Sequence, residues 1–95
     1  MNIESLRKKF NEKFNKMTDE EKQEFDNWFI SIEDDLVRFY GIDECIENEE
    51  QREKFLDFLY MYATVHDKDE FDERYDQGIF NMAIEYAGID TDNCK

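Results

Sequence analysis

The side chains that could support catalysis or metal binding are few, and their spacing matches no standard site. His66 is the only histidine, so a histidine-based general base or zinc site would depend on a single ring. Cys45 and Cys94 lack the spacing of a paired zinc ligand, and no Glu-x-x-His pair of the di-iron bundle type occurs. We therefore expect no catalytic residue, no metal, no cofactor and no enzyme activity.

Carboxylates dominate the chemistry of the chain. Its 95 residues include 26 Asp and Glu against 12 Lys and Arg, for a formal net charge of -14. Residues 1–17 hold 5 basic and 2 acidic side chains, which leaves 7 basic and 24 acidic side chains for residues 18–95. Because phosphate backbones and anionic lipids attract Lys and Arg, this balance argues against direct binding to nucleic acid or to a membrane.

The acidic residues occur in three blocks, which we predict to form a partner-binding surface. Some stand in the first turn of an expected helix, where the helix dipole stabilises each by roughly 0.3–1 kcal/mol. Others stand further inside, where like charges on neighbouring turns repel one another. Surplus charge that folding does not need suggests a partner of opposite charge. The candidate residues are Asp19, Glu20, Glu24, Glu33, Asp34, Asp35, Glu47, Glu49, Glu50, Glu53, Asp69, Asp72, Glu73 and Asp76.

Two apolar residues, Ile30 and Val37, lie on a flank of the expected second helix. Asp26 and Glu33 stand beside them on a helical wheel. An apolar pair rimmed by carboxylates is typical of an interface with a basic protein surface. The alternative is that a neighbouring helix covers both residues, and a four-helix bundle favours this alternative.

The elements that must position these groups are all helical. The sequence has no Pro and three Gly, and its apolar residues recur with a helical period. We expect one all-α domain over residues 1–95, a small bundle of about four helices at 2–16, 19–40, 49–65 and 68–87. The third segment is apolar around most of its circumference, which predicts that it is the central helix.

Helix boundaries carry their own signals. Gly41 and Gly88 each follow a periodic segment, which predicts left-handed C-caps. In the last helix the apolar face changes after Gly78, which indicates either a kink there or burial of the second half on two sides. Three pairs have the spacing of a capping box: Thr18 with Glu21, Asn48 with Gln51, and Asp67 with Glu70.

The cysteine count and the lack of long apolar runs bear on the compartment. Two cysteines are too few for a disulfide framework, and no apolar run approaches the length of a membrane span. No secretory signal is recognisable at the N-terminus. We expect free thiols and a cytoplasmic location, in the host cell if a phage encodes the chain.

In size, acidity and helices rich in Asp, Glu and aromatic residues, the chain resembles the DNA-mimic inhibitors of phages and mobile elements. Anti-restriction and anti-CRISPR proteins are examples. The resemblance covers overall charge and length, with no shared residue motif. It implies a stoichiometric inhibitor that occupies the basic groove of a nuclease or effector complex. Duplex DNA carries one charge per about 1.7 Å of axis, so only a dense carboxylate array competes with it.

Other interpretations stay open. A non-mimic acidic binding module, such as an immunity protein, an antitoxin or a small complex subunit, would bind through one or two apolar or aromatic anchors. A housekeeping helical domain would carry its charge for solubility alone. Steep loss of binding with salt distinguishes the mimic from both.

Overall fold

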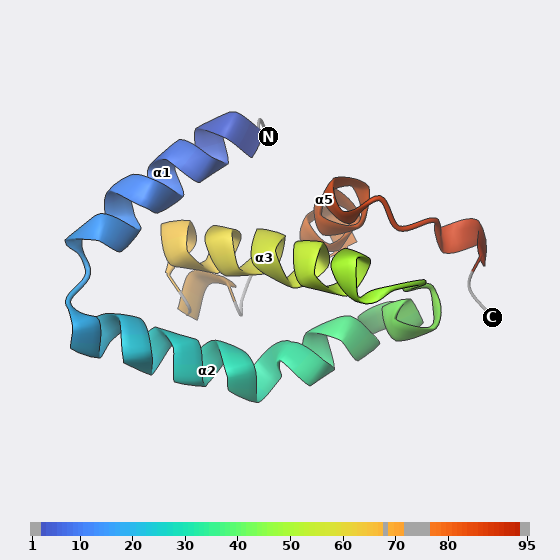
Figure 1. The fold of residues 1–95 in the computed structure, drawn as a ribbon, viewed down its shortest axis with the longest axis horizontal. Coiled ribbons are helices and arrows are strands. Elements are labelled where there is room, and N and C mark those ends of the chain that lie inside the picture. The colour runs from blue at the N-terminus through green and yellow to red at the C-terminus, as the bar shows by residue number, and fades with distance from the viewer. Residues whose placement is uncertain (1–2, 68, 72–76, 94–95) are drawn as a thin grey trace.

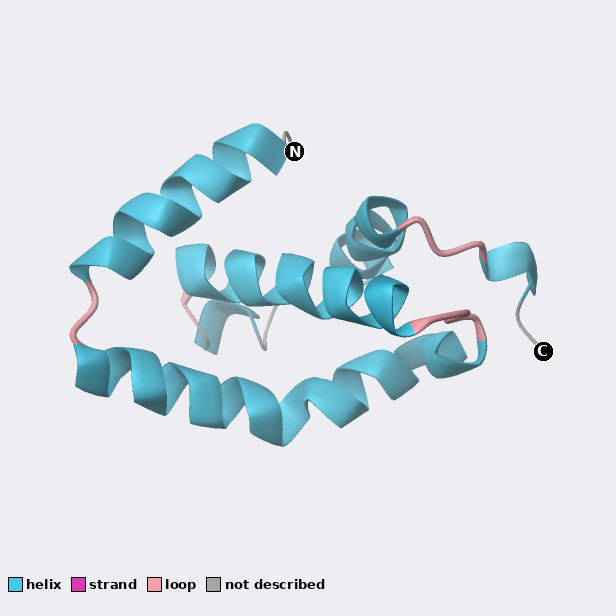
Figure 2. Ribbon diagram, viewed as in Figure 1, coloured by secondary structure: helices cyan, strands magenta, loops and turns pink. Residues whose placement is uncertain are grey.

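The computed structural model describes residues 3–67, 69–71 and 77–93, and these ranges contain helices and connecting turns without a strand (Figures 1 and 2). This confirms the predicted small all-α bundle. Residues 69–71 are helical, and no helix in the described ranges is both long and apolar enough to cross a bilayer. The other elements are α1 (Ile3–Lys16), α2 (Asp19–Arg38), the 3₁₀ helix η1 (Phe39–Glu44), α3 (Glu49–His66), α5 (Gln77–Ala87) and the 3₁₀ helix η2 (Thr91–Asn93).

The central helix is α3, as predicted. It contacts α1, α2 and α5, with α2 running antiparallel to it on one side and α1 on the other (Figure 1). Phe55, Leu59 and Ala63 on α3 have no exposed surface. A helix covered on several sides must be apolar around most of its circumference, which explains why α3 lacks a distinct polar face.

The predicted capping box forms at Thr18, and a variant of it forms at Asn48, where the Gln51 side chain bonds to the residue before the cap. The Thr18 hydroxyl accepts from the Glu21 N–H at 3.1 Å, while the Glu21 carboxylate accepts from the Thr18 N–H at 2.9 Å. The Asn48 side chain accepts from the Gln51 N–H at 2.9 Å, and the Gln51 side chain accepts from the Glu47 N–H at 2.8 Å. These local hydrogen bonds fix where α2 and α3 begin.

The C-terminus of α5 has the predicted left-handed glycine. Gly88 has φ +70°, the Ile89 N–H donates to the Ile84 carbonyl at 3.1 Å, and the Gly88 N–H donates to the Glu85 carbonyl at 3.2 Å. This pair of bonds is a Schellman motif.

The second helix ends earlier than predicted. α2 stops at Arg38 and tightens into η1, so that Gly41, at φ +71°, lies inside a 3₁₀ segment and does not cap an α-helix. The tighter winding turns Ile42 and Cys45 into the core, where both are buried.

The fourth predicted helix corresponds to residues 69–71 and to α5, and residues 72–76 lie outside the described ranges. Asp67, the proposed cap, adopts φ +72° and ψ +146°, and its carbonyl accepts from the Phe71 N–H at 2.9 Å. Gly78 lies in the first turn of α5. The adjacent residues Ile79 and Phe80 are both buried. The alternative of a kink at Gly78 depends on residues 72–76, which lie outside the described ranges.

The expectation of free thiols is wrong for Cys45, which is buried and disulfide-bonded. Cys94 is the only other cysteine in the sequence and lies outside the described residues. Sequence spacing says nothing about which distant residues meet in space, so the bond left no signal in the sequence.

Candidate functional site

Two side-chain contacts define how α2 and α3 lie against each other. The Tyr60 hydroxyl of α3 donates to the Asp26 carboxylate of α2 at 2.5 Å. The Arg52 guanidinium of α3 lies 3.4 Å from the Asp34 carboxylate of α2. The two contacts are eight residues apart on each helix: from Asp26 to Asp34 on α2, and in the opposite direction, from Tyr60 to Arg52, on α3. The antiparallel pair therefore keeps one register over two turns.

A hollow of about 270 Å³ lies between α2 and α3. Its buried lining is apolar, and its more exposed lining is charged. We call this hollow, together with Asp26 and Asp34, the acidic groove. The residues that line the hollow are Phe29, Glu33, Arg52, Glu53, Leu56, Asp57 and Tyr60.

The acidic groove carries five carboxylates and one guanidinium. Arg52 pairs with Asp34, whereas Glu33, Glu53 and Asp57 form no ion pair within the described part of the chain. Glu33 and Glu53 come from opposite helices and line the same hollow, so their like charges repel. The groove thus holds negative charge that folding leaves uncompensated.

Tyr60 stays protonated in the acidic groove. Burial raises the pKa of its hydroxyl well above the ordinary tyrosine value, and the hydrogen bond to Asp26 and the charge of that carboxylate raise it further. The hydroxyl therefore remains a donor at neutral pH, which holds Asp26 at one end of the groove.

The structure brings three of the predicted acidic residues into the groove: Glu33, Asp34 and Glu53. It adds Asp26 and Asp57, which the block pattern did not select. These two residues can be identified only from the antiparallel register of α2 and α3, which depends on the fold and not on local charge density.

The other predicted residues do not share this surface. Glu50 pairs with Lys54 at 3.3 Å, one turn along α3. Three of the predicted residues, Asp72, Glu73 and Asp76, lie outside the described residues. The remaining ones are exposed on α2, near the start of α3 or in residues 69–71: Asp19, Glu20, Glu24, Asp35, Glu47, Glu49 and Asp69. Most of the predicted residues in the described ranges therefore lie outside the acidic groove.

The two apolar residues on the flank of α2, Ile30 and Val37, differ in exposure. Val37 is 6% exposed, so the alternative that a neighbouring helix covers both residues holds for Val37. Ile30 is 64% exposed and is the only large apolar side chain with that degree of exposure among the described residues. It lies one helical turn from both Asp26 and Asp34, which contact α3, so it stands beside the acidic groove.

The basic α1 helix docks on the bundle without neutralising it. Arg7 donates to the Tyr86 hydroxyl at 3.2 Å, and Lys13 donates to the Val65 carbonyl at 3.4 Å. Val65 lies in the last turn of α3, where the helix dipole favours a cation. Within the described ranges, no Lys or Arg of α1 forms an ion pair with an acidic side chain.

His66 lies in the last turn of α3 and is half-buried. The His66 ring packs against Tyr62, with ring centroids 4.3 Å apart. Among the described residues, no group of three or more His, Cys, Asp and Glu side chains is placed to hold a metal ion.

Comparison with known proteins gives no match. No protein-family model, no curated protein and no solved structure is similar to the chain. The function is therefore argued from the acidic groove and its surroundings.

Proposed function

We propose that the protein is a stoichiometric inhibitor whose carboxylates take the place of nucleic-acid phosphates. Its target is the basic nucleic-acid-binding groove of a nuclease or a related effector complex, as for anti-restriction and anti-CRISPR proteins. The observation that carries the proposal is the acidic groove, with five carboxylates on two packed helices and one guanidinium. The inhibitor acts without catalysis, metal or cofactor, and binds neither nucleic acid nor membrane.

The electrostatics of the groove favour such a partner. In the free protein, Glu33 and Glu53 line one hollow whose single cation, Arg52, pairs with Asp34. A Lys or Arg from a partner relieves this repulsion on binding, so the complex gains energy that the free fold lacks. Attraction of this kind is screened by salt, with a screening length of about 10 Å at 0.1 M.

We place the inhibitor in the cytoplasm, where its targets act. Structural disulfides are rare in that compartment because thiols there are kept reduced. Inhibition should therefore persist when the Cys45 disulfide is reduced, since the acidic groove lies on α2 and α3 and contains no cysteine.

The proposal is tested by capture on the immobilised protein from bacterial lysate at about 0.1 M and about 0.5 M salt, which differ strongly in screening. We expect a nucleic-acid enzyme to be retained at low salt, released at high salt, and inhibited in proportion to the added protein. The double variant Glu33→Lys with Glu53→Lys should abolish both effects.

The matched control is Glu20→Lys with Glu24→Lys, which makes the same charge change on exposed α2 residues outside the groove. It should weaken binding less than the groove variant. Retention that survives high salt, or a groove variant that inhibits normally, would contradict the proposal.

A second candidate function is supported by Ile30. An exposed apolar side chain beside a charged groove is the arrangement of an anchor residue in a non-mimic binding module, such as an immunity protein, an antitoxin or a small complex subunit. In that case Ile30→Asn should weaken binding more than tenfold, and binding should persist at about 0.5 M salt.

A further inference from the structure

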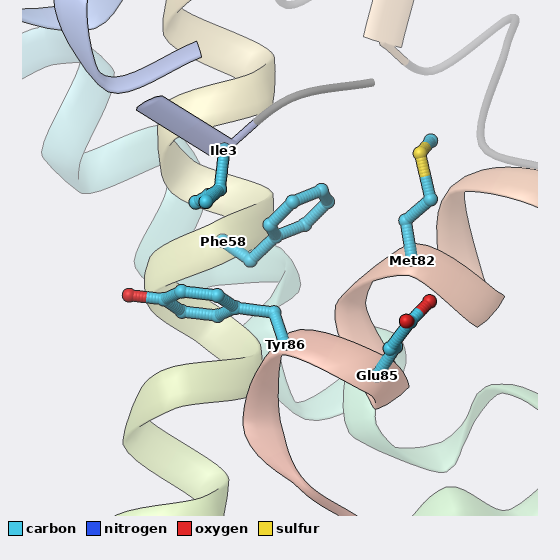
Figure 3. Close-up of a pocket in the computed structure, with 5 residues that line it drawn as sticks. All are labelled: Ile3, Phe58, Met82, Glu85 and Tyr86. Atoms are coloured by element: carbon cyan, nitrogen blue, oxygen red, sulfur yellow. The ribbon is translucent and has the colours of Figure 1, made fainter. Parts of the chain in front are cut away.

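A second hollow lies on another part of the molecule, where the start of α1 meets α3 and α5. Its volume is about 250 Å³, and Figure 3 shows the side chains around it. None of these residues belongs to the acidic groove. The lining residues are Ile3, Phe58, Met82, Glu85 and Tyr86.

Among the described residues that line the hollow, four of the five side chains are apolar or aromatic. Phe58 is buried, and its ring centroid lies 5.7 Å from that of Tyr86. Met82 and Ile3 are partly buried and pack against the core. Aromatic rings and a polarisable thioether form a wall that accepts flat or flexible apolar groups.

Glu85 adds one negative charge to this apolar wall. It is exposed, lies one turn from Met82 on α5, and has no ion pair in the described chain. The nearby cation Arg7 is held by the Tyr86 hydroxyl at 3.2 Å, and Figure 3 shows that hydroxyl pointing away from Glu85 and Met82. Arg7 therefore does not neutralise the Glu85 carboxylate.

We propose that this hollow binds an arginine side chain of a protein partner. The methylene stem of arginine matches the space between Phe58 and Met82, and its guanidinium pairs with the Glu85 carboxylate while facing an aromatic ring. Lysine suits the hollow less well, because its ammonium is a compact and strongly hydrated charge that does not stack.

This inference goes beyond the proposed function, because it concerns one shaped contact outside the acidic groove. Arginine is enriched among the residues that dominate binding energy at protein interfaces. The hollow beside Met82 would therefore bind one specific arginine of a basic partner, whereas the acidic groove attracts positive charge without selecting a particular residue.

The test is methyl NMR on the full chain, with Ile and Met side chains labelled. Ile3 and Met82 report on the hollow, and Ile30 reports on the acidic groove. The probes are three capped tripeptides with a central arginine, citrulline or lysine between glycines. We expect saturable shifts of Ile3 and Met82 with the arginine peptide, with a dissociation constant on the order of millimolar.

The citrulline peptide keeps the shape of arginine and removes its charge, so it should bind at least tenfold more weakly. The lysine peptide should also bind more weakly than the arginine peptide. Glu85→Gln should remove most of the arginine response, while the control Glu12→Gln, an exposed glutamate of α1 outside both hollows, should leave the Ile3 and Met82 shifts unchanged.

Three results would overturn the inference: equal shifts with arginine and citrulline, a Glu85→Gln response equal to that of the unmodified protein, or no movement of Ile3 and Met82. Shifts confined to Ile30 would overturn it while supporting the acidic groove. Shifts at Ile3 and Met82 without any at Ile30 would support the hollow and weaken the proposed function.

Discussion

The hydrogen bond between Tyr60 and Asp26 joins two helices through a single hydroxyl. Tyr60→Phe removes this donor and should lower the free energy of unfolding by about 1 kcal/mol. Urea denaturation at neutral pH measures the change. In an Asp26→Asn background the same substitution should cost less, because the carboxylate acceptor is gone. Equal costs in both backgrounds would show that the bond contributes no coupling.

The raised pKa of Tyr60 also predicts the behaviour at high pH. The folded-state pKa lies above the unfolded value of about 10, so the contribution of Tyr60 to stability is complete below about pH 10 and is lost as the pH rises toward the folded-state pKa. The unmodified protein should therefore lose stability above about pH 10 more steeply than Tyr60→Phe. Parallel stability curves for the two proteins would contradict this expectation.

Asp67 stores backbone strain between α3 and the following helical residues. Its φ of +72° with ψ of +146° lies in a region that glycine adopts readily and other residues rarely do. Asp67→Gly should raise the free energy of unfolding by about 1 kcal/mol, measured by urea denaturation. The converse change is Gly88→Ala, at φ +70°. An added Cβ atom there would have no heavy atom within 4 Å, so the substitution should lower the free energy of unfolding by about 1 kcal/mol through backbone strain alone.

Among α1, α2, α3 and α5, α1 buries the fewest side chains in the described ranges. Leu6, at 1% exposure, is its only fully buried side chain, and the rest of its apolar stripe is partly exposed. Leu6→Ala should cost about 3 kcal/mol and release α1 before the rest of the bundle. Native-state hydrogen exchange would then show α1 amides opening at lower free energy than α3 amides. The control Phe14→Ala, at a partly exposed residue of α1, should lower the free energy of unfolding less than Leu6→Ala. Simultaneous opening of both helices would contradict this order.

The helices were predictable from the sequence to a greater extent than the site. The capping boxes at Thr18 and Asn48 depend on residues three apart, so local chemistry determines them. The central position of α3 followed from its apolar circumference. The meeting of Glu33 with Glu53 depends on which flanks of two helices face each other, and this is decided by packing of the whole core.

The acidic groove contains only three of the predicted acidic residues for the same physical reason. Charge density along the chain records where helices start, because acidic residues are favoured in the first turn. It does not record which helix faces lie side by side. Asp57 shows the difference, since its neighbours Leu56 and Phe58 are apolar, so that it belongs to no acidic block, and it still lines the acidic groove.

At the scale of the whole molecule, the net charge of -14 opposes folding through self-repulsion. Only two ion pairs join described residues, Arg52–Asp34 and Lys54–Glu50. We expect the thermal midpoint to rise with added salt and, at first, on acidification from about pH 7 to about pH 5, since both reduce repulsion. A gain of 1 kcal/mol corresponds to roughly 4–8 °C in a domain of this size. A midpoint that falls steadily over this pH range would mean that the carboxylates are paired internally.

The attachment of α1 to α3 has a consequence for synthesis of the chain. α1 ends at Lys16 and α3 ends at His66, so the ribosome must add fifty more residues before the whole docking surface exists. At roughly 5–20 residues per second this takes about 3–10 s. During that interval the nascent chain exposes a basic helix with an aromatic stripe, close to the polyanionic surface of the ribosome. The basic helix is thus synthesised before residues 18–95, which hold 24 of the 26 acidic side chains.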